Sequence, residues 1–216
     1  MARFIKKTYS LRDPDARAFH RQKEAPSRSP FRLQESNLFF IGLRGSGKTT
    51  LAGELARTLQ ANCLDTDQEI VRRAGASIAE IVRDQGWEEF RRLEHSVLAD
   101  ICRRTGNVVA TGGGIVLAPE NRKLLKQNGT VFYLLAEVST LRSRLSRDPS
   151  PSARPQLTNL SQDDELVTTL REREPLYMEC LDFILQAEKP VDELVEDVLT
   201  SLGLNSPGAG SHAGST

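Results

Sequence analysis

One glycine-rich stretch has the residue types and the spacing of a phosphate-binding loop. Gly42 is followed, after four residues, by Gly47-Lys48-Thr49, which fits the pattern G-x-x-x-x-G-K-[ST]. Glycines let successive backbone N–H groups point at one anion, and a helix N-terminus adds partial positive charge. We expect Lys48 to reach the β- and γ-phosphates of a nucleoside triphosphate and Thr49 to ligate Mg²⁺. The expected nucleotide contacts are Gly45, Ser46, Gly47, Lys48, Thr49 and Thr50.

The residues on either side of the loop support this interpretation. The apolar run 38–41 predicts a buried strand, and Leu51, Leu55 and Leu59 recur at every fourth residue, as in an amphipathic helix. The alternative is a glycine-rich turn between strand and helix that binds no ligand. Because the strand, the spacing, the lysine and the threonine are all in place, the nucleotide site is favoured.

Further groups of residues also suit phosphoryl transfer. Asp65 and Asp67 stand two residues apart after a short apolar segment, so both carboxylates can face one side. Beside a phosphate loop they suit a metal ion or an attacking hydroxyl; a helix N-cap and a surface acid are the alternative. The run 111–114, Thr-Gly-Gly-Gly, has more glycines than a turn needs, which suggests that a ligand approaches the backbone closely.

Several arginines are candidates whose residue types alone do not decide their role. Arg91 and Glu94 lie one helical turn apart, and a solvated pair on a helix surface is the simpler interpretation of them. Arg154 and Arg173 are equally compatible with ordinary surface charges.

Strand-like and helix-like segments alternate about five times along the chain, in the manner of an α/β protein. Ser77 is expected to start a short helix that Gly86 ends, Ser139 to cap a later helix, and Pro190 to open the last one. The pattern predicts a parallel sheet with helices on both faces. Ligands bind such sheets at the carboxyl ends of the strands, where the loop, the two acids and the glycine run fall. The expected strands are 38–41, 63–64, 107–110, 131–135 and 183–185.

Composition indicates a soluble, single-domain protein of the cytoplasm. The 216 residues are 38% hydrophobic and 27% charged, and no apolar run approaches the ~20 residues that span a membrane. Cys63, Cys102 and Cys180 are scattered without CxxC spacing, which indicates reduced thiols. Residues 1–34 hold nine Lys or Arg against three Asp or Glu, so the remainder is acidic and no nucleic-acid surface is expected on it.

Three segments fall outside the alternating pattern. Residues 1–36 are expected to form a flexible basic extension; docking of its phenylalanines on the domain or on a second subunit, or an organelle transit peptide, are the alternatives. Residues 148–160 contain three prolines and have the length of a lid. Residues 205–216 are rich in Gly and Ser and are expected to be disordered, which leaves 37–204 as the folded domain.

Taken in order, the segments GLRGSGKTT, LDTDQEI, GWEEFRRLE, VVATGGG, ARPQL and REREPLY resemble the shikimate kinase family. The resemblance covers about residues 37–202. It implies a nucleoside-monophosphate-kinase-like P-loop fold, three-layered α/β/α with a lid, and a five-stranded parallel sheet of order 2-3-1-4-5. It also implies that ATP phosphorylates the 3-hydroxyl of shikimate, giving shikimate 3-phosphate and ADP on the way to chorismate and the aromatic amino acids.

The resemblance also implies roles for individual residues. Lys48, Asp67 and Arg154 would be catalytic, with Asp67 binding the shikimate hydroxyls and taking the proton, and Arg154 closing over the transferring phosphate. Arg147 would flank the adenine, and Asp65 would help to hold Mg²⁺ through water. The shikimate site would comprise Asp67, Arg91, Gly112, Gly113, Gly114 and Arg173.

Two other functions stay open. One is a different small-metabolite kinase, acting on gluconate or on a nucleotide, but a paired arginine clamp for a carboxylate has no use for a nucleobase. The other is a nucleotide-binding protein without activity, but Lys48, Asp67 and Arg154 are all present. The lid reads RPQL where RPLL is frequent in the family, and the extension has no counterpart in its compact members. We expect a monomer, with a dimer formed through the extension as the alternative.

Overall fold

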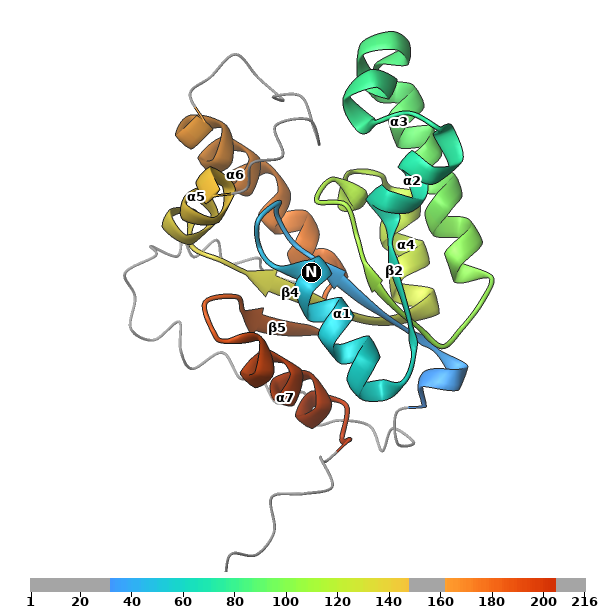
Figure 1. Cartoon of the computed structure of the whole chain (residues 1–216), viewed down its shortest axis with the longest axis vertical. Helices are drawn as coiled ribbons and strands as arrows, with labels where there is room; N and C mark the ends of the chain where they lie inside the picture. Colours follow the sequence, from blue (N-terminus) through green and yellow to red (C-terminus); the bar gives the residue numbers. More distant parts are fainter. Residues whose placement is uncertain (1–31, 148–161, 205–216) are drawn as a thin grey trace, which may run out of the picture. The chain divides into compact units, whose positions relative to one another are not determined.

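The described part of the chain is built around one parallel sheet. The computed structural model describes residues 32–147 and 162–204. The strands are β1 (Asn37–Ile41), β2 (Asn62–Asp65), β3 (Asn107–Ala110), β4 (Gly129–Leu135) and β5 (Phe183–Gln186), in the order β2-β3-β1-β4-β5 (Figure 1). The predicted fold class and strand order are therefore confirmed. The predicted lid, the tail and most of the basic extension lie outside the described residues.

Helices cover both faces of the sheet and make a three-layer molecule (Figure 1). Helices α1 and α7 pack together on one face, and α4 and α6 pack together on the other, where α3 joins α4. Helix α2 packs against α3. The helices are α1 (Lys48–Leu59), α2 (Thr66–Ala74), α3 (Ile78–Cys102), α4 (Pro119–Asn128), α5 (Val138–Arg147), α6 (Gln162–Cys180) and α7 (Val191–Ser201), with short 3-10 turns at Leu33–Glu35 and Ile115–Leu117.

The central strand β1 fixes where the functional loops emerge. Its residue Phe39 lies opposite Val109 of β3 and Val131 of β4, and every residue of β1 is buried because helices cover both faces. All the strands run in the same direction, so their carboxyl ends meet at one edge of the sheet. The segments that follow β1, β2 and β3 there are the phosphate loop, the start of α2 and the glycine run.

Local sequence signals predicted some boundaries correctly and others not. Ser77 caps α3 in a capping box with Glu80, and Gly86 interrupts α3 with φ 83° and ψ 171°, as expected. The expected cap at Ser139 is wrong, because α5 already begins at Val138 and the Ser139 hydroxyl contacts the Glu137 carboxylate instead.

The end of the predicted basic extension belongs to the folded domain. The Thr105 hydroxyl donates a hydrogen bond to the Gln34 carbonyl at 2.6 Å, and the Gly106 N–H donates to the Ser36 carbonyl at 3.0 Å. These bonds tie the turn Leu33–Glu35 to the segment before β3. In the described part of the chain, no helix has both the length and the apolar character needed to cross a membrane.

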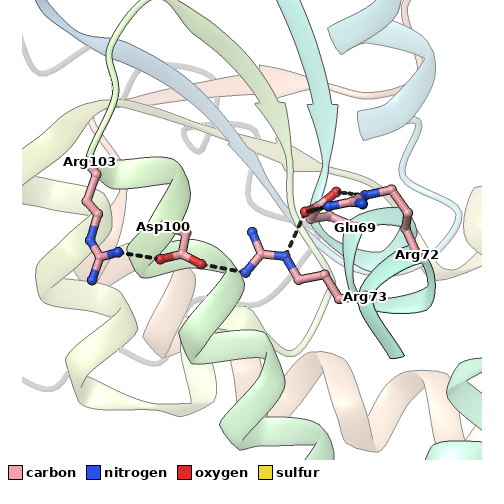
Figure 2. A network of polar contacts seen from close by, with 5 residues as sticks. All are labelled: Glu69, Arg72, Arg73, Asp100 and Arg103. Atoms are coloured by element: carbon pink, nitrogen blue, oxygen red, sulfur yellow. Dashed lines mark hydrogen bonds and ion pairs between the residues drawn. The ribbon is translucent and has the colours of Figure 1, made fainter. Parts of the chain in front are cut away.

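A chain of ion pairs joins α2 to the far end of α3 (Figure 2). Glu69 accepts hydrogen bonds from Arg72 and Arg73, which lower the pKa of its carboxyl to about 2. Arg73 also reaches Asp100 on α3 at 2.5 Å, and Asp100 pairs with Arg103. The link ties the last turn of α2 to the last turn of α3.

A buried asparagine ties together the amino ends of three strands. The Asn37 side chain is fully buried at the start of β1, and its Nδ2 donates to the carbonyl of Arg104 at 2.8 Å and to that of Asn128 at 3.4 Å. Its Oδ1 accepts from the backbone N–H and from the side-chain amide of Asn107, both at 3.0 Å. The carboxamide thereby connects the starts of β1, β3 and β4.

Asn37→Ala is expected to lower the free energy of unfolding by roughly 3 kcal/mol, since each buried partner left without a hydrogen bond costs about 1–3 kcal/mol. Urea denaturation followed by circular dichroism measures this loss. Asn62→Ala, at an exposed position on the edge strand β2, is the matched control and is expected to change it by less than about 0.5 kcal/mol. Equal losses of unfolding free energy in the two variants would contradict the role of Asn37 in joining the three strands.

Candidate active site

The phosphate loop connects β1 to α1 and needs glycine at its turns. Gly42, Gly45 and Gly47 have φ values of 145°, 81° and 98°, which L side chains rarely adopt. A Cβ on Gly42 would also stand 2.8 Å from the Leu134 carbonyl oxygen. Gly47 caps α1 without a side chain, so the first N–H groups of that helix are not bonded to a capping side chain.

Lys48 is held in a buried position over this loop. Its side chain is 8% exposed, and Nζ donates to the Leu43 carbonyl at 2.7 Å and to Ser46 Oγ at 3.3 Å. A positive charge fixed in this way beside the helix N-terminus suits an anion with several oxygens. The loop thus has the arrangement that the sequence predicted for binding a nucleoside triphosphate.

Asp65 connects the loop to the second candidate acid. Its Oδ2 accepts a hydrogen bond from the Thr49 hydroxyl at 2.7 Å, and its Oδ1 accepts from the backbone N–H groups of Asp67 and Gln68 at 2.9 and 3.2 Å. The helix-cap interpretation of Asp65 is confirmed, and the same carboxylate also contacts the loop hydroxyl; its role toward a metal ion stays a prediction. A hydroxyl beside a carboxylate offers the oxygen donors that Mg²⁺ prefers. The residues present fit that ion.

Arg91 and Glu94 form a partly buried pair, which overturns the interpretation of a solvated one. Glu94 is fully buried, Arg91 is 23% exposed, and Nη1 donates to the carboxylate at 2.6 Å. The guanidinium carbon also lies 5.5 Å from the ring centre of Trp87 and 5.2 Å from that of Phe90. Carboxylate and rings together fix the orientation of the guanidinium.

The glycine run is the place where these groups meet. A Cβ on Gly114 would stand 2.4 Å from Arg91 Nη1, so only glycine leaves room for that guanidinium. A Cβ on Gly113 would stand 3.3 Å from the Gly42 carbonyl oxygen and 3.7 Å from Arg173 Nη1. Arg173 is 7% exposed and is therefore no ordinary surface charge.

Hydrogen bonds from neighbouring elements hold the glycine run in place. The Gly112 N–H donates to the Thr66 hydroxyl at 2.8 Å, and the Tyr177 hydroxyl donates to the Gly113 carbonyl at 2.6 Å. Tyr177 in turn stacks on Tyr133 with ring centres 4.9 Å apart, and burial raises the pKa of Tyr133. A run with no side chains of its own is thus positioned by α2 and α6.

A cavity of about 1160 Å³ lies along the phosphate loop. It is lined by the loop residues 44–51, by Asp65, Asp67 and Gly113, by Arg144 and Leu145 of α5, and by the segment 187–191. All the predicted nucleotide contacts from Gly45 to Thr50 line it. Arg91 and Arg173 do not line it but lie against the glycine run at its border.

Arg144 is a cavity arginine that the sequence had not indicated, whereas the predicted contact of Arg147 with the adenine stays a prediction. Arg144 lines the cavity and donates to the carbonyls of Ser46 at 3.1 Å and Ala187 at 2.6 Å, whereas Arg147 is exposed at the end of α5 and does not line it. Helical spacing could have indicated Arg144, because it follows the buried Leu141 by three residues and so shares its face. Arg154 lies outside the described residues.

The parallel sheet, the phosphate loop and the acids beside it define a P-loop kinase. A model of the family described as shikimate kinase matches residues 44–203. The chain therefore belongs to the shikimate kinase family, whose members are ATP-dependent kinases.

Individual relatives agree with this assignment. The chain is 41% identical over 168 residues to a shikimate kinase of Nitratidesulfovibrio vulgaris, covering 78% of this chain and 96% of that protein. It is 44% identical over 150 residues to shikimate kinase 2 of Photorhabdus laumondii, covering 69% and 86%. A solved shikimate kinase from Acinetobacter baumannii in complex with shikimate has a TM-score of 0.74 and 33% identity, covering 82% of this chain and 97% of that one. The shikimate kinase from Aquifex aeolicus has a TM-score of 0.65 and 32% identity, covering 77% and 96%.

Gly114→Ala is expected to displace the Arg91 guanidinium, because the new methyl group would overlap it. The cost in unfolding free energy is expected to be about 1–3 kcal/mol, as for other overpacked sites. Trp87, the only tryptophan, lies beside this guanidinium, so its fluorescence emission reports the displacement.

Gly53→Ala is the control, since a Cβ there meets nothing within 4 Å on the surface of α1. This variant is expected to leave the tryptophan emission unchanged and to gain up to about 1 kcal/mol in helix propensity. Unchanged emission and stability in Gly114→Ala would contradict the close packing.

Proposed function

We propose that this chain transfers the γ-phosphoryl group of ATP to the 3-hydroxyl of shikimate, giving shikimate 3-phosphate and ADP. One observation carries the choice of acceptor. The guanidinium groups of Arg91 and Arg173, from α3 and α6, both approach the glycine run that borders the nucleotide cavity. Two cations at such a place suit a small acceptor that carries a carboxylate. The relative from Acinetobacter baumannii, solved with shikimate, supports the same acceptor.

Binding of the acceptor then follows from charge and geometry. Each charge-assisted hydrogen bond from an arginine to the shikimate carboxylate contributes about 1.5–3 kcal/mol. With the carboxylate held at this end, the ring hydroxyls face Asp67, which lines the cavity beside the phosphate loop. The buried Glu94 keeps Arg91 oriented toward the acceptor before the acceptor arrives, which reduces the ordering cost of binding.

The phosphoryl transfer forms one P–O bond and breaks another, and one proton moves from the acceptor to Asp67. The 3-hydroxyl oxygen attacks the γ-phosphorus, the bond from that phosphorus to the β–γ bridging oxygen breaks, and ADP leaves. Asp67 orients the hydroxyl and takes its proton, while Lys48 and the loop N–H groups stabilise the charge on the phosphoryl oxygens. The predicted role of Arg154 in this step stays a prediction.

We propose that Mg²⁺ is held by Thr49 directly and by Asp65 through water. When bound, this ion would neutralise charge on the β- and γ-phosphates. The hydrogen bond between Thr49 and Asp65 supports the assignment, because it brings the two oxygen donors together at the loop. We also propose a cytoplasmic location, for which the three unpaired cysteines are the supporting observation, and a monomeric state.

A coupled ADP-release assay with alternative acceptors tests the proposed function. Shikimate is expected to support turnover, whereas gluconate and nucleoside monophosphates are not, since neither combines a carboxylate with ring hydroxyls in this geometry. Turnover with a nucleoside monophosphate or with gluconate, and none with shikimate, would contradict the proposal. ADP release without any acceptor is the background to subtract.

Arg91→Ala is expected to raise the KM for shikimate about 10- to 100-fold, which corresponds to losing roughly 1.5–3 kcal/mol of charge-assisted bonding. The KM for ATP should change less than about threefold, because Arg91 does not line the nucleotide cavity. Arg92→Ala removes the neighbouring exposed arginine, which pairs only with Glu89 among the described residues, and should leave both values unchanged. An unchanged KM for shikimate in Arg91→Ala would remove Arg91 from the clamp.

A further inference from the structure

Arg44 is a cation of the phosphate loop to which none of the roles above applies. It lines the cavity together with Lys48, Asp67 and Gly113, and it is half-buried. It lies between Gly42 and Gly45, on the part of the loop that turns toward the acceptor side. This arginine adds a second positive charge to a loop whose lysine is already in place.

The backbone of Arg44 is fixed on two sides. Its N–H nitrogen lies 3.4 Å from the point that a Cβ on Gly113 would occupy, so the loop packs directly against the glycine run. On the other side, a Cβ on Gly45 would stand 3.2 Å from Leu145 Cγ of α5. Arg44 therefore emerges where the nucleotide half of the site meets the acceptor half, from a backbone that has little freedom to shift.

The other cations that line the cavity within the described residues already have partners. Lys48 and Arg144 donate to backbone carbonyls, Arg72 pairs with Glu69, and Lys189 pairs with Asp197. Arg44 has no hydrogen bond or ion pair with any described residue. A half-buried guanidinium without such partners has all five N–H donors available for an anion. Its planar shape lets two of them bind two phosphate oxygens at once.

We propose that Arg44 binds the transferred phosphoryl group from the acceptor side, and so recognises the phosphorylated product in preference to the unphosphorylated acceptor. The inference rests on the proposed function. During transfer the phosphorus leaves the bridging oxygen of ADP and becomes bonded to the acceptor oxygen, so its three remaining oxygens move toward the glycine run. Arg44 borders that run, whereas the loop N–H groups at the start of α1 stay with the nucleotide.

Binding of three ligands to Arg44→Gln tests this inference. The affinity for shikimate 3-phosphate is expected to fall about 10- to 100-fold, the range for losing one charge-assisted contact. The affinities for shikimate and for ADP are expected to change less than about threefold, because neither carries the transferred group. The same contact in the transition state predicts a fall in kcat of about tenfold or more. Arg44→Lys, which keeps the charge but loses the fork, should lie between the wild type and Arg44→Gln.

Arg72→Gln is the matched control, since it removes another arginine that lines the cavity but is paired with Glu69. It should leave the affinity for shikimate 3-phosphate within about twofold of the wild type, because that arginine already has an acceptor. Thermal unfolding of each variant, followed by circular dichroism, separates a local loss from a damaged loop.

The outcomes distinguish this inference from the proposed function. If the wild type phosphorylates shikimate but Arg44→Gln keeps its affinity for the product, the inference alone fails. It also fails if Arg44→Gln weakens ADP and shikimate as much as it weakens the product. If the wild type neither phosphorylates shikimate nor binds shikimate 3-phosphate, the proposed function and the inference fail together.

Discussion

The candidate site depends on a steric constraint at two adjacent glycines. The phosphate loop, Arg91 and Arg173 come from three separate elements, and all of them approach the backbone at Gly113 and Gly114. A methyl group at Gly114 would overlap the Arg91 guanidinium, and one at Gly113 would press on the Gly42 carbonyl. The phosphate loop and the two arginines can adjoin here only because this backbone has no side chains.

A partly buried ion pair lies beside these two glycines. Glu94 is a fully buried carboxylate, and a buried charge is costly unless it is paired with good geometry. Arg91 supplies that geometry and is held in turn by the rings beside it, so the pair is better understood as a means of orientation than as a source of stability. The acceptor would then meet a guanidinium whose direction was set before it bound.

The sequence predicts those parts of the structure that have local signals. The phosphate loop, the alternating strands and helices, the break at Gly86 and the capping box at Ser77 each follow from a few adjacent residues. The strand order and the acceptor residues came instead from a resemblance that extends over most of the chain. Both depend on contacts between distant segments, which no single segment encodes.

Other features could not be predicted for the same physical reason. Whether Arg91 and Glu94 are solvated depends on what packs over α3, and Tyr177 reaches Gly113 only because α6 crosses behind the sheet. Arg144 and Arg147 differ by less than one turn of α5, yet only Arg144 faces the loop. Spacing from the buried Leu141 would have indicated Arg144 as a residue on the inner face of α5.

The position of the Asp65 carboxylate allows the binding of one substrate to affect the binding of the other. One of its oxygens holds the Thr49 hydroxyl at the nucleotide loop, and the other holds the backbone N–H of Asp67 at the acceptor side. A ligand that alters the first bond therefore acts on the position of Asp67 through a single rigid group. Such coupling is reciprocal. If bound nucleotide raises the affinity for the acceptor by some factor, bound acceptor raises the affinity for the nucleotide by the same factor.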